Sequence, residues 1–333
     1  MTVVSRLGYL AIGVADLPEA TEFYSRFVRL DVTERIGRTA FLTGGLEHHW
    51  LRLEEGRGSG LKRVGYVVDG ESGLAEARAK LANAGVAFTE GGDPAADRVQ
   101  RWLRFRDPGG VEIELYAGMY ERGVAPAHPG ITMQKFLHAA WATPNFEQTT
   151  DFYQQVLGFK VSDWVESRAG FFRAADRYHH SLVLIRAERP VFNHFCIQVE
   201  SLDDVMRARH NALKGGVKLR DDLLRHAPSG SIGFYMKDET RGFAIEFCIG
   251  HPQLDDATHQ PRILPSVPET MNVWTAPLPP LGPAAAVAAP AAGGTADGAP
   301  AAAPPEAPAT WAPGTGMTAG GSRDIVGSAV VAG

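Results

Sequence analysis

The chain of 333 residues has few cysteines, no long apolar run and no excess of positive charge. Its two cysteines, Cys196 and Cys248, cannot build a disulfide framework, which fits a reducing compartment such as the cytoplasm. No uncharged apolar stretch reaches the ~18 residues of a membrane-spanning helix, and the N-terminus lacks the pattern of a signal peptide. A formal net charge of −5 argues against a surface for nucleic acid or acidic lipid. We therefore expect a cytoplasmic protein that binds neither nucleic acid nor membranes.

The last part of the chain stands apart in composition. Residues 278–333 consist largely of Ala, Pro and Gly, with few side chains able to form a core. Such a composition predicts a disordered tail. The residues before it, 1–277, are enough for two domains that each bury a core.

Residues 1–277 contain an internal repeat. The segment that starts at Arg6 aligns without a gap with the segment that starts at Lys135, so that Tyr24 corresponds to Tyr153. The offset is 129 residues at this point (24 to 153), and insertions raise it to 131 and then to 132 further along. The repeat predicts two domains of one kind, residues 1–125 and 126–277, followed by the tail at 278–333.

Each copy divides again into two units with the same order of elements. A short strand rich in β-branched and aromatic residues precedes an amphipathic helix, and further alternating strands follow. The predicted fold class is α+β, with tandem βαβββ modules whose sheets curl into half-open barrels around a concave face. Ser201 is placed as the N-cap of the last helix and Gly215 as its stop. The predicted helices are residues 17–27, 73–84, 146–156 and 202–214.

Comparison of the two copies singles out three positions. The second copy carries His138, His194 and Glu246 on three different predicted inner strands. Two imidazoles and one carboxylate on one face of a metal form the facial triad of non-haem Fe(II) oxygenases, which leaves other coordination positions open. A metal site is therefore predicted in the second copy alone. The equivalent positions of the first copy hold Tyr9, Arg63 and Glu114.

A further pattern lies at the end of the second copy. Six residues follow the order and, except for one residue in a turn, the spacing of a known fingerprint: His226, Phe234, Tyr235, Asp238, Gly242 and Glu246. With this pattern the chain resembles the type I extradiol ring-cleaving dioxygenases of the vicinal oxygen chelate superfamily, in the branch of the 2,3-dihydroxybiphenyl and catechol 2,3-dioxygenases. It departs from the pattern in the longer turn, which holds Glu239 instead of Pro, and in Pro228 and Ser229, where close relatives often have Asn and Asp.

The resemblance implies a function and a set of roles. His138, His194 and Glu246 would bind Fe(II), although the same triad can bind Mn(II). His226 and Tyr235 would hydrogen-bond the substrate oxygens. The two glyoxalase-like domains would serve extradiol (meta) cleavage of a catecholic compound by O2, in aromatic catabolism, and we expect the enzyme to be a homo-oligomer.

The resemblance also implies a general acid–base histidine. His179 and His180 are adjacent, so only one of them can point inward. We favour His180, because the residues after it match the family pattern better. A histidine can take a catechol proton and later return one at neutral pH. The equivalent pair of the first copy, His48 and His49, has no metal site beside it and is expected to be structural.

Two other functions are compatible with the same fold. A glyoxalase-like isomerase would usually need a fourth protein ligand, and a non-catalytic binding protein would not need a complete triad with an acid–base histidine. For a catechol dioxygenase, the expected pocket is apolar. Arg225, beside His226, is the one obvious cation, and side-chain alternation is expected to aim it away from the face that His226 uses. We therefore expect a catechol with an apolar 3-substituent to be preferred over one that bears a carboxylate. The expected lining residues are Trp141, Phe171, Phe172, Phe192 and Ile232.

Overall fold

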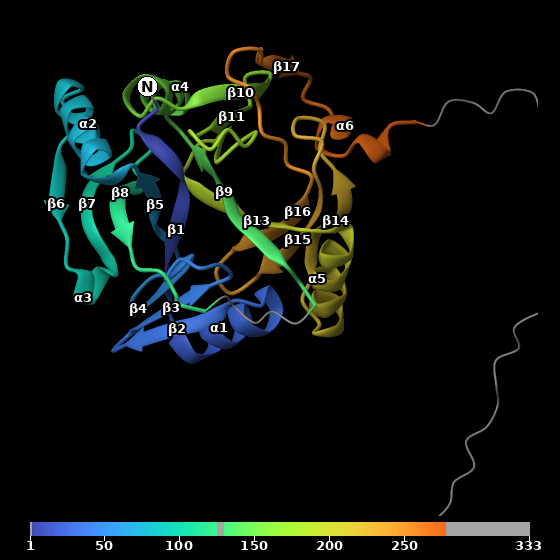
Figure 1. Cartoon of the computed structure of the whole chain (residues 1–333). Helices are drawn as coiled ribbons and strands as arrows, with labels where there is room; N and C mark the ends of the chain where they lie inside the picture. Colours follow the sequence, from blue (N-terminus) through green and yellow to red (C-terminus); the bar gives the residue numbers. More distant parts are fainter. Residues whose placement is uncertain (1, 125–129, 278–333) are drawn as a thin grey trace, which may run out of the picture. The chain divides into compact units, whose positions relative to one another are not determined.

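The computed structural model describes residues 2–124 and 130–277 (Figure 1). These residues belong to one compact unit. The predicted tail at 278–333 and the predicted domain boundary between 125 and 126 lie outside the described residues. Among the described helices, none is long and apolar enough to cross a bilayer.

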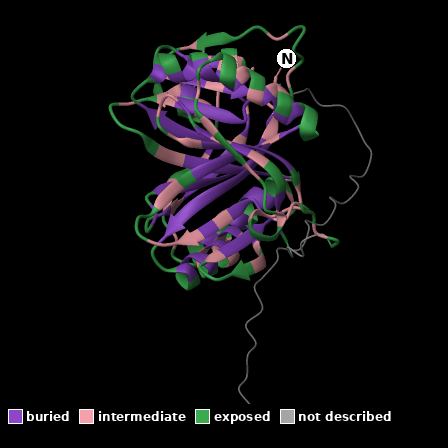
Figure 2. Cartoon of the chain, turned by 90° about the vertical axis from the view of Figure 1, so that its left-hand side faces the viewer, coloured by how far each residue is buried: buried purple, intermediate pink, exposed green. Residues whose placement is uncertain are grey.

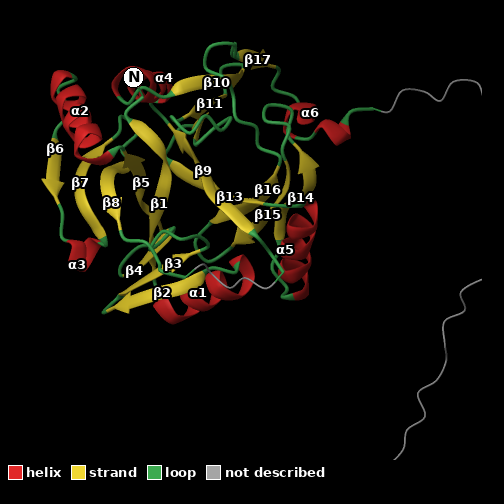
Figure 3. Ribbon diagram, in the orientation of Figure 1, coloured by secondary structure: helices red, strands yellow, loops and turns green. Residues whose placement is uncertain are grey.

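The first copy of the repeat forms an eight-stranded sheet from two βαβββ modules (Figure 3). The first module contains β1 (Val4–Val14), α1 (Leu17–Phe23), β2 (Asp31–Ile36), β3 (Thr39–Thr43) and β4 (Leu51–Glu55). The second contains β5 (Gly60–Val68), α2 (Gly70–Asn83), β6 (Phe88–Gly91), α3 (Pro94–Asp97), β7 (Val99–Arg106) and β8 (Glu112–Met119). The strand order β2-β3-β4-β1-β5-β8-β7-β6 places the first strand of each module at the centre, where β1 and β5 pair antiparallel.

The second copy repeats this plan with one strand more. Its first module contains β9 (Met133–Thr143), α4 (Phe146–Asp151), β10 (Lys160–Val165), β11 (Ala169–Arg173) and β12 (Leu182–Arg186). Its second contains β13 (Val191–Val199), α5 (Leu202–Lys214), β14 (Leu219–Arg225), β15 (Ile232–Asp238) and β16 (Phe243–Ile249). The order is β14-β15-β16-β13-β9-β12-β11-β10-β17, in which β17 (Arg262–Leu264) adds a parallel edge strand. Tandem βαβββ modules in open, curled sheets are thus confirmed.

The central strands have the sequences that a doubly covered strand requires. In β13 the six residues from His194 to Val199 are all buried, and in β16 the six residues from Phe243 to Cys248 are buried. Strands covered on both faces show continuous apolar runs rather than strict alternation. In Figure 2 the buried residues accordingly follow the strands, and the exposed ones follow the loops and the outer faces of the helices.

All four predicted helices are present with somewhat different ends, and the described residues contain two further short α-helices, α3 and α6 (Pro268–Met271), that were not predicted. Helix α5 spans Leu202–Lys214 as predicted, with Ser201 in a capping box with Asp204. The helix ends at Lys214 with Gly215 as its C-cap, as predicted, and the left-handed conformation that follows belongs to Gly216 at φ +77°. Helices α1 and α4 continue into π-helical turns, and α2 begins at Gly70. The π-helical turns are Tyr24–Val28 and Phe152–Val156.

The two π-helical turns place tyrosines that join the two copies of the repeat. The Tyr24 hydroxyl of the first copy donates to Asp238 Oδ2 at 2.7 Å, and the Tyr153 hydroxyl of the second donates to Asp107 Oδ2 at 3.1 Å. All four side chains are buried. Asp238, which matches the family fingerprint, therefore acts in packing between the copies. Its turn also supplies Arg241, whose Nε atom lies 2.5 Å from Asp238 Oδ2.

Candidate metal centre and cavity

Three adjacent strands of the second sheet bring the predicted ligands together. Strand β13 lies between β9 and β16, and its Cys196 is opposite both His138 of β9 and Glu246 of β16. His194 stands two residues before Cys196 and therefore faces the same side of the sheet. The side chains of His138, His194 and Glu246 are buried, with 1%, 7% and 1% exposed. All three stand on paired strands, so the sheet rather than a loop sets their positions.

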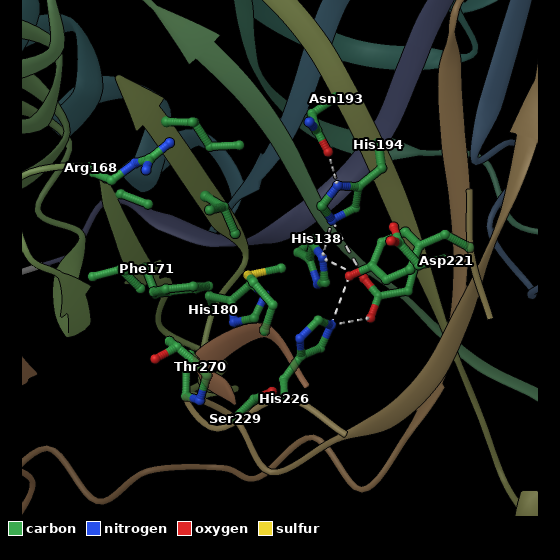
Figure 4. Close-up of a pocket in the computed structure, with 18 of the residues that line it drawn as sticks. His138, Arg168, Phe171, His180, Asn193, His194, Asp221, His226, Ser229 and Thr270 are labelled. Carbon is green, nitrogen blue, oxygen red and sulfur yellow. Dashed lines mark hydrogen bonds and ion pairs between the residues drawn. The ribbon is translucent and has the colours of Figure 1, made fainter. Parts of the chain in front are cut away.

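The ligand atoms converge on one point (Figure 4). The His138 Nε2 atom lies 3.0 Å from His194 Nε2 and 3.1 Å from Glu246 Oε2, and His194 Nε2 lies 3.4 Å from the same oxygen. Metal–ligand bonds of about 2.1 Å at right angles separate neighbouring ligand atoms by about 3.0 Å. The Glu246 Oε2 atom is buried and has no hydrogen bond of regular geometry, as expected of an atom that faces a cation. These residues therefore fit a divalent metal ion.

Burial and neighbouring groups set the charges of the site. Burial lowers the pKa of His194 to about 4, so this imidazole is neutral at neutral pH. Burial opposes ionisation of Glu246, but three surrounding imidazoles hold the pKa of its carboxyl well below the usual range. The Asn193 Oδ1 atom lies 2.7 Å from His194 Nδ1, so Nδ1 carries the proton and Nε2 keeps a lone pair for the metal.

The two substrate-binding residues implied by the fingerprint lie beside the triad. The His226 Nε2 atom is 2.8 Å from the Tyr235 hydroxyl and 3.6 Å from Glu246 Oε1. Burial raises the pKa of Tyr235, so its hydroxyl keeps the proton and remains a donor. Ser229, which stands where close relatives often have Asp, lines the same cavity (Figure 4).

The two adjacent histidines of the second copy point in different directions. His180 lines the cavity, and its ring centroid is 4.1 Å from that of His138. The His179 Nε2 atom instead lies 2.8 Å from Asp163 Oδ2, in the interior. Of the two candidates for the acid–base group, the geometry therefore favours His180.

The first copy builds a different cluster at the equivalent place. The Tyr9 hydroxyl donates to Glu114 Oε1 at 2.8 Å, and Arg104 Nε donates to Glu114 Oε2 at 2.6 Å. Arg63 Nη1 lies 3.2 Å from the Tyr9 hydroxyl. Both carboxylate oxygens of Glu114 therefore have partners, and arginines supply the positive charge that a metal would supply in the second copy. His49, against the ring of Tyr9 at 4.7 Å, takes the place of His180.

The cavity above the triad has a volume of about 630 Å³. Its apolar wall is formed by Val165, Ala169, Phe171, Val183, Ile185, Val267, Pro268 and Met271. Its other lining residues besides the triad, His180, His226 and Tyr235 are Arg168, Asn193, Arg220, Asp221, Pro228, Ser229, Ser266 and Thr270. The short helix α6 (Pro268–Met271), which the sequence did not predict, thus contributes to the wall.

The predicted lining was wrong for four of its five residues. For three of them the cause is that successive residues of a strand face opposite sides, and for Phe192 it is a shift in the register of β13 between Phe192 and His194. Phe171 lines the cavity, whereas its neighbour Phe172 is fully buried in the core. Trp141 is an odd number of residues from His138 and also lies in the core. Phe192 and Ile232 are likewise not among the lining residues. Arg225 is not among the lining residues and donates to a backbone carbonyl, as the alternation predicted, but two cations that were not expected, Arg168 and Arg220, line the cavity.

His251 is a buried residue near the triad that the sequence comparison did not single out. It is 5% exposed, and neither ring nitrogen has a hydrogen bond among the described residues. Its ring centroid lies 4.4 Å from that of His180 and 5.8 Å from that of His138. Ligand atoms of these three histidines lie within 4.8 Å of one another. The comparison of the two copies could have found it, because its equivalent in the first copy, at the offset of 132, is Met119 and not a histidine.

Cys196 completes another group whose ligand atoms lie within 4.8 Å, together with His138 and Glu246. Burial raises the pKa of the Cys196 thiol, so it keeps its proton and is a poor metal ligand. Its sulfur lies 3.3 Å from the Cys248 sulfur, and both cysteines are free thiols.

Comparison with known proteins assigns the family. The model of the Glyoxalase/Bleomycin resistance protein/Dioxygenase superfamily matches residues 6–115 and 135–247, the two copies of the repeat. An iron-dependent extradiol dioxygenase of Rhodococcus jostii (strain RHA1) is 33% identical over 204 residues, which cover 55% of this chain and 68% of that protein. The chain belongs to the extradiol dioxygenase family. This dioxygenase is also 27% identical to the biphenyl-2,3-diol 1,2-dioxygenase of Pseudomonas sp. (strain KKS102) over 271 residues, 76% of this chain and 92% of its relative.

Solved structures agree with this assignment at the level of the fold. A Mn(II)-bound glyoxalase from Novosphingobium aromaticivorans superimposes with a TM-score of 0.74 at 24% identity, covering 83% of this dioxygenase and 92% of that chain. At this identity the match shows the shared fold alone. The resemblance predicted from the fingerprint and the fold class are both confirmed.

Proposed function

We propose that this dioxygenase cleaves a catecholic ring next to its two hydroxyl groups, with Fe(II) held by His138, His194 and Glu246. The observation that carries the proposal is the convergence of three ligand atoms, all within 3.4 Å of one another, in a cavity lined by further titratable side chains. The relative that acts on biphenyl-2,3-diol supports the substrate class. When bound, the ion supplies a Lewis acid that lowers the pKa of the catechol hydroxyls and brings the ring beside O2. Mn(II) fits the same ligands.

His180 is the proposed proton acceptor for the bound catechol. Burial lowers its pKa well below the usual range, so its imidazole is neutral and can accept a proton at neutral pH. It lines the cavity beside His138, where a catechol held at the triad would lie. It would return that proton to the product later in the reaction.

Tyr235 and His226 are proposed to orient the substrate oxygens. Their 2.8 Å hydrogen bond places one neutral donor and one imidazole on the side of the cavity that carries Glu246. Arg220 packs its guanidinium over the Tyr235 ring at 4.3 Å and donates to Asn193 Oδ1 at 2.9 Å. It therefore holds this side of the cavity in place, and its charge is already paired with Asp221.

The proposed substrate is a catechol with an apolar 3-substituent, alkyl or aryl. The wall formed by strands β10–β12 presents Val165, Phe171, Val183 and Ile185, which favour an apolar group. Arg168 is the exception on this wall: it is exposed, and its guanidinium has no partner among the described residues. An apolar ring fills the wall and leaves that guanidinium in water.

The test combines metal analysis with a product assay on the full chain purified under argon. We expect about one Fe(II) or Mn(II) per chain, and a yellow ring-fission product from 2,3-dihydroxybiphenyl with uptake of one O2 per ring. The His194→Ala variant is expected to lose metal and activity together while it stays folded, because the cleft is formed by the strands. The matched control is His49→Ala, a buried histidine of the first copy, which should keep both. Full metal retention in His194→Ala would contradict the ligand assignment.

Oxygen uptake separates this proposal from the two alternatives. A glyoxalase-like isomerase would convert its substrate without consuming O2, and a binding protein would hold the catechol unchanged. A chain that carries its metal and binds catechol but consumes no O2 would therefore refute the proposed reaction.

A further inference from the structure

A chain of three buried side chains ends at His180. The Asp163 carboxylate on β10 lies 2.8 Å from His179 Nε2, and the His179 Nδ1 atom lies 3.0 Å from His180 Nδ1. Asp163, His179 and His180 are 0%, 1% and 5% exposed. The second ring nitrogen of His180, Nε2, has no hydrogen bond among the described residues, although the side chain lines the cavity. The chain therefore runs from a buried anion to the substrate cavity.

The protonation states along this chain follow from its first member. Arg262 donates to both oxygens of Asp163, through its backbone N at 2.9 Å, its Nε at 3.0 Å and its Nη2 at 2.5 Å. Burial works against ionisation, but His179 and Arg262 lower the pKa of Asp163 to about 2. An ionised carboxylate can only accept hydrogen bonds, so His179 must carry its proton on Nε2.

The remaining protons are then determined. Burial lowers the pKa of His179, so it is neutral and its Nδ1 has a lone pair. The contact with His180 Nδ1 is a hydrogen bond only if His180 donates it, which places the single proton of neutral His180 on Nδ1. We propose that Asp163 and His179 are positioning residues that hold His180 in the tautomer whose Nε2 faces the cavity as a proton acceptor. This inference rests on the proposed function of His180.

The tautomer matters for the proton step. In the assigned form, the O–H bond of a bound catechol breaks and an N–H bond forms at His180 Nε2, which gives an imidazolium. His180 keeps its Nδ1–H hydrogen bond to His179 throughout. In the opposite form, Nε2 already carries a proton and cannot accept one.

The first copy of the repeat contains the same hydrogen-bonded chain, and among the described residues no group of possible metal ligands lies beside it. Glu34, the equivalent of Asp163 at the offset of 129, lies 3.2 Å from His48 Nε2, and His48 Nδ1 lies 3.1 Å from His49 Nδ1. Arg98 donates to both oxygens of Glu34 at 2.6 Å. A carboxylate–His–His chain thus lies on both sheets, and in the second it ends at the cavity above the triad. The Glu34–His48–His49 chain of hydrogen bonds is therefore a matched control for a purely structural role.

The decisive variant is Asp163→Asn. Two donors of Arg262 face Oδ1 and one faces Oδ2, so the amide of the variant should keep its oxygen at Oδ1 and turn its NH2 group toward His179, at the cost of one hydrogen bond from Arg262. That NH2 donates to His179 Nε2, which reverses both histidines and puts the proton of His180 on Nε2. A second pair of variants separates the loss of the hydrogen-bond acceptor from the loss of the imidazole ring. His179→Leu removes the acceptor of His180 Nδ1–H, and His179→Asn restores an acceptor oxygen near the position of Nδ1.

We expect Asp163→Asn and His179→Leu to lower kcat by about 10- to 100-fold with KM and metal content nearly unchanged, and His179→Asn to recover most of the loss. Glu34→Gln and His48→Leu should affect the thermal midpoint to a similar extent and leave kcat within about twofold. Equal kcat in the two sets of variants would overturn the proposal and leave the chain a structural feature of both sheets.

The tautomer itself can be read without turnover. The ring 15N shifts of labelled histidine, in the full chain loaded with diamagnetic Zn²⁺, should show His180 Nε2 unprotonated in the native protein and protonated in Asp163→Asn. A protonated Nε2 in the native protein would refute the inference. If no catechol is cleaved, the proposed function fails, and the ring shifts alone decide whether Asp163 sets the tautomer.

Discussion

The two aspartates that join the copies of the repeat should respond in opposite ways to the loss of their charge. Asp107 is 4% exposed, accepts hydrogen bonds from Val111 N at 2.9 Å and the Tyr153 hydroxyl at 3.1 Å, and has no ion pair within residues 2–124 and 130–277. Burial raises the pKa of its carboxyl from 3.8 to about 6. Its equivalent, Asp238, has the buried Arg241 beside it.

The size of the effect at Asp107 follows from that pKa. A difference of about 2.2 units, at 1.36 kcal/mol each, makes the ionised carboxylate cost the folded state about 3 kcal/mol. Because the folded pKa lies above the unfolded one, the native state binds more protons between about pH 4 and pH 6. The unfolding free energy therefore falls as the pH rises through this window and levels off above about pH 7.

The Asp107→Asn variant removes this charge and keeps the hydrogen bonds, since its oxygen can accept from Val111 N and its amide can donate to the Tyr153 hydroxyl. We expect it to be about 2–3 kcal/mol more stable than the native chain at pH 7.5, and to lose the fall in stability between pH 4 and 6. Asp238→Asn leaves the buried Arg241 without one partner and should cost about 3 kcal/mol at the same pH. Urea unfolding of the three proteins at pH 5.0 and 7.5 measures both effects. A destabilised Asp107→Asn with the native pH dependence would show that Asp107 is stably ionised and refute the reasoning.

Three further predictions concern the site. His180→Gln should keep metal and substrate binding but lose about 10²- to 10⁴-fold in kcat, the range for a positioned proton-transfer group; loss of metal would instead make His180 a ligand. Asn193→Ala frees the His194 ring and should weaken metal binding by about 10- to 100-fold in a chelator competition assay, and unchanged affinity would rule out this positioning role. In kcat/KM at one oxygen concentration, 2,3-dihydroxybiphenyl should exceed 3,4-dihydroxyphenylacetate by about tenfold or more, with each buried methylene contributing about 0.8 kcal/mol. Arg168→Ala should leave kcat/KM for 2,3-dihydroxybiphenyl unchanged. A tenfold higher kcat/KM for 3,4-dihydroxyphenylacetate would show that Arg168 recruits carboxylates.

The repeat made the fold readable from the chain alone. Hydrophobic period and turn residues determine local elements, and a second copy of the pattern confirms each of them, so the βαβββ order and helix α5 could be predicted. The same comparison pointed to His138, His194 and Glu246, because a ligand set stands out where its equivalents are Tyr, Arg and Glu. The order of the elements and the positions of these ligands can both be found by aligning the two copies in the sequence.

The choice between neighbouring side chains depended on the tertiary structure. Whether Phe171 or Phe172 meets the cavity depends on strand register and on which face of a sheet is covered, and neither is encoded in the composition of a short strand. His251 approaches the triad only because the chain turns back after β16.

The same holds for the polar partners of the site, because they come from distant parts of the chain. Strands β10 and β17 bring together Asp163 and Arg262, 99 residues apart, and Asp163 in turn contacts His179 beside His180. We propose that these hydrogen bonds set which nitrogen of His180 carries the proton. The sequence determined which residue types could do the chemistry. The packing of the sheets decided their partners, and through those partners their protonation states.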